Sequence, residues 1–160
     1  MLGTVWDRHH VLSHFGHPLP VPIRQRLDEH WVIERSAGLA SRVVEGTSQF
    51  AGPGRTVLAD LYTAPRSAAE LIASFTGEAP RVAEDHRITE EVPGGSRHAF
   101  WLTATVEGRE RHELYGFTAH DGRILAVACM YDNPDDLAWA QHVWRSATLT
   151  PHTPRHQPSG

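Results

Sequence analysis

The chain has 160 residues, 40% hydrophobic and 21% charged, proportions typical of one folded globular domain rather than a disordered or membrane-embedded chain. Its formal net charge is −4, and all 15 basic residues are arginines with no basic run among them. Affinity for phosphate or anionic lipid depends on clustered basic residues, so we expect no nucleic-acid partner and no attraction to a membrane surface.

The single cysteine, Cys129, excludes an intrachain disulfide and a cysteine-based zinc site. The first residues lack the basic and apolar regions of a signal peptide, and no apolar run approaches the ~20 residues of a spanning helix. We therefore expect a cytoplasmic protein without membrane insertion.

Residues 1–30 are predicted to be a leader rich in histidine and proline. On a helix His10, His14 and His17 would share one face, and imidazole is a usual zinc ligand. Gly16 weakens such a helix and Pro18 ends it. We therefore predict no metal site, and these three histidines are the residues that would form one if the helix held.

Three strand-like runs follow the leader, at residues 31–36, 41–46 and 55–62. A helix is predicted next, because Ser67 and Glu70 form a capping box. The helix carries an apolar stripe at the spacing of one helical face: Ala68, Leu71, Ile72 and Phe75.

Residues 82–131 have the pattern of an antiparallel meander of four strands. The turn residues between the strands are Pro93-Gly94-Gly95, Glu107-Gly108 and His120-Asp121-Gly122. The last strand, 123–131, is apolar on both faces, which is typical of a strand in the middle of a covered sheet.

The final predicted element is a helix that begins at Pro134, after a capping Asp132 or Asn133. Residues 150–160 have almost no apolar content, so we expect a disordered tail. The predicted fold class is α+β: an antiparallel β-sheet of about six to seven strands, with a helix after strand three and a C-terminal helix packed on it. Residues 31–149 would form this single domain.

Two segments carry a resemblance to a known group of proteins: RTVLADLYTAPRSAAELIASF (55–75) and the stretch from ELYGFTAHDGR to the final helix (113–149). Over roughly residues 31–149 the chain resembles the Mog/PsbP-like superfamily, which includes DcrB-like and LpqN/LpqT-like proteins. The resemblance implies a module that more often binds proteins or apolar ligands than catalyses, and it supplies no catalytic residues. Secreted members begin with a signal and a lipidated cysteine, which this chain lacks, so a cytoplasmic chaperone or adaptor role is expected.

Candidate chemistry lies in the meander. A two-residue turn at Glu107-Gly108 would place Thr103 opposite His112, and a loop spanning 119–122 would place His112 opposite Cys129 as well. A Cys–His pair can be nucleophilic, so Thr103, His112 and Cys129 are the candidate catalytic residues. A one-residue change in that loop would move Cys129 to the other face, and lone cysteines in central strands are usually inert.

The candidate ligand-binding residues are Trp101, His112, Leu114 and Trp139. The first three share one face of the meander, and Trp139 falls off the buried stripe of the final helix, where an exposed indole can mark a partner surface. We therefore predict a non-catalytic binding module, without a cofactor, that holds a protein segment or an apolar ligand on its sheet face. The alternative is a small-molecule enzyme, a cyclase, isomerase or hydrolase, that uses a histidine-lined pocket.

Overall fold

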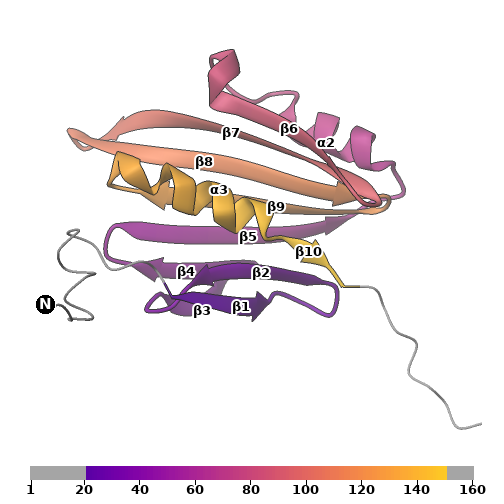
Figure 1. Cartoon of the computed structure of the whole chain (residues 1–160), viewed down its shortest axis with the longest axis horizontal. Coiled ribbons are helices and arrows are strands. Elements are labelled where there is room, and N and C mark those ends of the chain that lie inside the picture. Colours follow the sequence, from indigo (N-terminus) through magenta and orange to yellow (C-terminus); the bar gives the residue numbers. More distant parts are fainter. Residues whose placement is uncertain (1–20, 151–160) are drawn as a thin grey trace, which may run out of the picture.

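The computed structural model describes residues 21–150, which form two antiparallel sheets and two α-helices (Figure 1). The large sheet has seven strands in the order β3-β4-β5-β9-β8-β7-β6, and the small sheet has three in the order β1-β2-β10. The α+β fold class predicted from the sequence is confirmed. The strands are β1 (Pro22–Arg26), β2 (Trp31–Ser36), β3 (Ala40–Val44), β4 (Thr47–Gly52), β5 (Arg55–Thr63), β6 (Arg87–Val92), β7 (Gly95–Val106), β8 (Arg109–His120), β9 (Arg123–Tyr131) and β10 (Thr148–Leu149).

Three of these strands were not predicted. The chain turns at Glu45 and Gly46, which both have positive φ angles, so the predicted strand 41–46 stops early and β4 follows it. The helix therefore follows the fifth strand of the chain. Strand β1 lies inside the range assigned to the leader, and β10 is a two-residue strand beside β2. The predicted histidine face at residues 10, 14 and 17 and the predicted tail lie outside the described residues, apart from Thr150.

Helix α2 (Ala68–Thr76) covers one face of the large sheet, which we call the α2 face. Its predicted capping box is confirmed: the Ser67 hydroxyl accepts from the Glu70 amide at 3.1 Å, and the Glu70 carboxylate accepts from the Ser67 amide at 3.0 Å. A core forms between this helix and strands β7, β8 and β9. Its buried members are Ala68, Leu71, Phe100, Phe117, Ala119 and Ile124.

Helix α3 (Leu137–Arg145) and the small sheet cover the opposite face, which we call the α3 face. The short turn η2 (Pro134–Asp136) leads into the helix, and the predicted cap is present because the Asn133 side chain accepts from the Asp135 amide at 2.9 Å. The largest buried side chains between these layers are Trp31, Trp144, Phe50, Ile33 and Leu114.

Trp144 lies directly over Gly116 of β8. A Cβ atom at Gly116 would lie 2.5 Å from Trp144 Cδ1 and 2.7 Å from Cγ, inside van der Waals contact. The indole Nε1 donates to the Phe117 carbonyl at 3.1 Å, which fixes the ring against the strand. Only glycine therefore lets the helix approach β8 this closely.

We predict that Gly116→Ala lowers the free energy of unfolding by about 1–3 kcal/mol, because the added methyl group overpacks the core against Trp144. Urea denaturation measures the change. In a Trp144→Leu background the same alanine should be tolerated better, since the ring that it meets is gone. An equal loss in both backgrounds would contradict this explanation.

Glu90 of β6 joins three elements through ion pairs. Its carboxylate lies 2.6 Å from Arg97 Nε of β7 and 2.7 Å from Arg145 Nη2 of α3. The hydrogen bond from Arg145, with help from Arg97, lowers the pKa of Glu90 below its usual value, although partial burial opposes the shift. Glu90 therefore holds the end of α3 against the edge of the sheet.

Because the folded-state pKa of Glu90 is lowered, its contribution is present above the unfolded-state pKa of about 4.3 and is lost as pH falls through the lower, folded-state pKa. We predict that Glu90→Gln lowers the free energy of unfolding by about 1 kcal/mol at neutral pH, a value reduced for partial exposure. The difference from the unsubstituted protein should shrink in acid, as urea titrations across pH will measure. A difference that stays constant across pH would show that the charge does not matter.

Candidate functional site

The structure brings most of the sequence-predicted site residues together on the α3 face. Thr103 of β7 pairs with His112 of β8, as predicted, and the Thr103 Oγ1 atom lies 3.1 Å from His112 Nδ1. On its other side the imidazole stacks on Tyr131 of β9, with ring centroids 5.5 Å apart. His112 is thus fixed between a hydroxyl and an aromatic ring.

The predicted pairing of His112 with Cys129 is wrong. Strand β8 runs on to His120, and the turn to β9 contains only Asp121 and Gly122, so His112 pairs with Tyr131 and Cys129 pairs with Leu114. Cys129 stays on the α3 face, but it is fully buried, and burial raises the pKa of its thiol to about 12. At neutral pH it is a protonated core residue.

We predict that Cys129 is inert toward a thiol reagent such as 5,5′-dithiobis(2-nitrobenzoate) in the folded protein and reacts when guanidinium unfolds it. The burial that raises the thiol pKa also blocks the reagent. Absorbance of the released thiolate measures both rates. Rapid labelling of the folded protein would show that this part of the α3 face opens to solvent.

Trp101 and its neighbours form the accessible part of this face. The Trp101 ring stacks on His86 of the short turn η1 (Glu84–His86), with centroids 6.0 Å apart and planes 27° apart. Its cross-strand neighbour on β8, Leu114, is completely buried. We call this patch the Trp101 surface: His86, Trp101, Thr103 and His112.

Trp139 is half-buried and holds α3 against the sheets, although the sequence predicted an exposed indole. Its Nε1 atom donates to Ser36 Oγ at 2.8 Å, and its ring lies edge-on to Tyr131. The Arg55 guanidinium lies over the ring at 5.2 Å and pairs with Asp136 at 2.8 Å. These contacts give Trp139 a positioning role beside the Trp101 surface.

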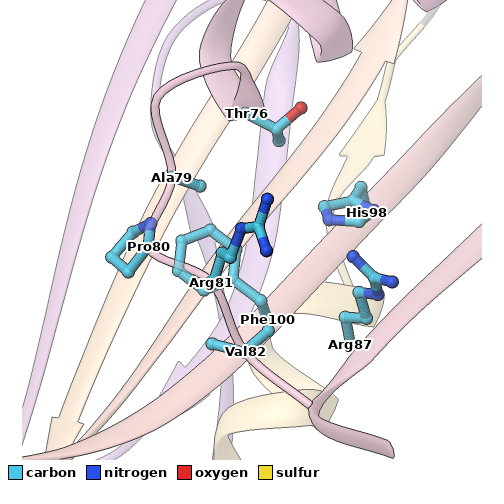
Figure 2. Close-up of a pocket in the computed structure, with 8 residues that line it drawn as sticks. All are labelled: Thr76, Ala79, Pro80, Arg81, Val82, Arg87, His98 and Phe100. Carbon is cyan, nitrogen blue, oxygen red and sulfur yellow. The ribbon is translucent and has the colours of Figure 1, made fainter. Parts of the chain in front are cut away.

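The α2 face carries a second feature, a pocket of about 490 Å³ between the α2–β6 connection and strands β6 and β7 (Figure 2). Arginine and histidine side chains enter it from the connection and from both strands, and Phe100 forms part of its wall. Its lining residues are Thr76, Ala79, Pro80, Arg81, Val82, Arg87, His98 and Phe100.

Sequence reasoning missed this pocket. The register β6–β7 places Arg87 opposite Phe100 and Thr89 opposite His98, and the Thr89 Oγ1 atom lies 2.8 Å from His98 Nδ1. The predicted turn at residues 93–95 was the one available signal for that register. The position of Arg81 depends on the path of the connection, which has no sequence periodicity.

Burial is the main cause that lowers the pKa of His98, and the positive charge of Arg87 adds to it. Arg87 also pairs with the exposed Glu84 at 2.9 Å.

Within residues 21–150 no group of three or more histidine, cysteine or acidic side chains is placed to hold a metal ion. Neither helix of this range has the length and apolar character that a membrane span requires.

Comparison with solved structures places this architecture among known folds, although no protein-family model and no curated protein matches the chain. The cyanobacterial PsbP protein CyanoP of Synechocystis sp. PCC 6803 matches with a TM-score of 0.54 and 13% identity, over 82% of this chain and 94% of that one. The Ran-binding protein Mog1p of Saccharomyces cerevisiae matches with a TM-score of 0.51 and 7% identity, over 81% and 96%. The chain has a Mog/PsbP-like fold.

A protein of Bacteroides thetaiotaomicron VPI-5482 also matches, with a TM-score of 0.57 and 8% identity over 76% of this chain. The match covers 46% of that protein, so the chain spans about half of its length. At these identities the likeness extends to the Mog/PsbP-like fold alone.

Proposed function

We propose that the protein is a non-catalytic binding module that holds a segment of a partner protein on the Trp101 surface. The observation that carries this proposal is a partly exposed indole that stacks on a histidine and pairs across the strands with the fully buried Leu114. Mog1p, which has the same fold, is a Ran-binding protein, and this supports a protein partner.

The surface has the physical properties of an interface anchor. Trp101 offers a large apolar area, and its contacts with His86 and Leu114 restrict it before any partner arrives. His112 is held in the same way by Thr103 and Tyr131. Side chains that are already ordered lose little conformational entropy on binding, which raises affinity.

The enzyme alternative would use Thr103 and His112, with Glu110 3.8 Å from His112 Nε2. Thr103 and Glu110 are both exposed on the hairpin β7–β8. Electrostatic catalysis depends on groups held in a site that excludes water, and bulk water reaches these two side chains. We therefore favour binding. A cytoplasmic location and the absence of a cofactor and of a nucleic-acid partner stay predictions from the sequence.

We predict that Trp101→Ala weakens the complex with the partner by about 30-fold, the usual effect of removing an aromatic anchor. Proteins retained from the source cell by the immobilised chain would be identified by mass spectrometry, and the affinity of each purified candidate measured by calorimetry. Circular dichroism would establish that the variant is folded.

Tyr62→Ala provides the matched control. Tyr62 is an aromatic residue with a ring contact of its own, to Phe75 at a centroid distance of 5.0 Å; it is 45% exposed, more than Trp101, and it lies on the α2 face. The control should leave the affinity unchanged. A partner retained equally by the Trp101→Ala chain would refute the Trp101 surface as its binding site.

A further inference from the structure

The pocket beside α2 lies on the face opposite Trp101, since Phe100 and Trp101 are adjacent residues of one strand. We propose that it binds a small organic anion, whose carboxylate or phosphate group lies among Arg81, Arg87 and His98 and whose apolar body lies against Phe100. This site is independent of the proposed protein-binding function, because the two use different residues on different faces.

The lining separates into a charged part and an apolar part. Arg81, Arg87 and His98 supply nitrogen donors, and none of the eight lining residues carries a carboxylate (Figure 2). Guanidinium groups match the planar oxygen pairs of carboxylates and phosphates, and hydrogen bonds between such ions are about twice as strong as neutral ones. The charge balance of the lining therefore favours an anion over a neutral or cationic ligand.

The arginines are available for a ligand. Arg87 pairs with Glu84 at the surface, where the Glu84 side chain is 91% exposed. Because such exposed ion pairs contribute little free energy, a ligand oxygen can replace the Glu84 carboxylate at little energetic cost. Arg81 makes no ion pair with any residue of the 21–150 range, and it lines the same pocket as Phe100 (Figure 2). Two cations thus border one pocket without a strong internal partner.

The apolar wall is rigid. Phe100 is 6% exposed, and its ring stacks on Tyr115 with centroids 5.3 Å apart. The Tyr115 hydroxyl in turn donates to the buried Glu113 carboxylate at 2.7 Å. Val82, Ala79 and Pro80 complete the apolar lining from the connection. The pocket volume of about 490 Å³ is within the range of small-molecule sites, which run from roughly 300 to 1,000 Å³.

His98 gives the site a hydrogen-bond donor whose pKa depends on the charges around it. The neutral ring carries its proton on Nε2 when the Thr89 hydroxyl donates to Nδ1, so Nε2–H can donate to an anion. The positive groups beside it are Arg87 and Arg81, from β6 and from the connection. A bound anion offsets their charge and should raise the pKa of His98.

Two aromatic anions, benzoate and phenyl phosphate, test the proposal against the neutral probe benzyl alcohol in an NMR titration of the full chain. We expect saturable shifts of the amides of residues 79–82 and 98–100, with each anion bound at least about tenfold more tightly than benzyl alcohol. The preference between the two anions identifies the oxygen group that the site takes. Inorganic phosphate should bind more weakly than phenyl phosphate, because it has no body to lie against Phe100.

Arg81→Gln should weaken binding of the preferred anion about tenfold, because it removes the cation and keeps a polar side chain of similar length. Arg109→Gln is the matched control, because Arg109 lines a separate pocket at the hairpin β7–β8. Benzyl alcohol binding as tightly as the anions, equal effects of the two arginine variants, or no saturable shift would each overturn the proposal.

Trp101→Ala should leave anion binding unchanged. If the anion binds and no partner depends on Trp101, the proposed protein-binding function fails and this site stands. If the complex with the partner depends on Trp101 and no anion binds to the pocket, the protein-binding function stands and the anion site is rejected.

Discussion

The contact between Trp144 and Gly116 is the constraint on which the α3 face depends. The missing side chain of Gly116 lets α3 descend onto β8, and the indole hydrogen bond to Phe117 fixes the depth. Arg97 and Arg145 both lie over the Trp144 ring, at 5.5 and 5.3 Å, and both pair with Glu90. One indole thus connects the helix, the middle of the sheet and its β6 edge.

The position of α3 also decides which part of its face is left accessible. The helix packs over β8 and β9, and Trp139 near its start is fixed to Ser36 of the small sheet. Trp101, on β7, lies at the side of this layer, where it is partly buried and stacks on His86. The connection that contributes His86 begins with the residues that line the pocket on the α2 face. One segment between α2 and β6 therefore completes a site on each face of the sheet.

Much of the fold was predictable because its signals are local. The capping box of α2 and the turns of the meander depend on residues within a few positions of one another, and the structure has them where the sequence indicates. Strand β4 has little hydrophobic alternation, and its partners β3 and β5 define it more than its own residues do. Strand β1 is a single polar edge strand next to a proline-rich segment. Such strands are set by tertiary pairing, which a local pattern does not contain.

The site shows why a face can be predicted more reliably than a pair. The expected loop of 119–122 and the observed two-residue turn differ by two residues in register, which changes the partner of His112 from Cys129 to Tyr131. Side chains alternate with a period of two, so a shift of two keeps every residue on its face. Thr103, Trp101, His112 and Leu114 accordingly share one face, as the alternation requires, whereas the reactive pair depended on the exact register. A prediction of which residues share a face survives a two-residue error in register, whereas a prediction of a catalytic pair does not. In a meander of this kind, sequence alone is therefore a better guide to a binding face than to a pair of reacting side chains.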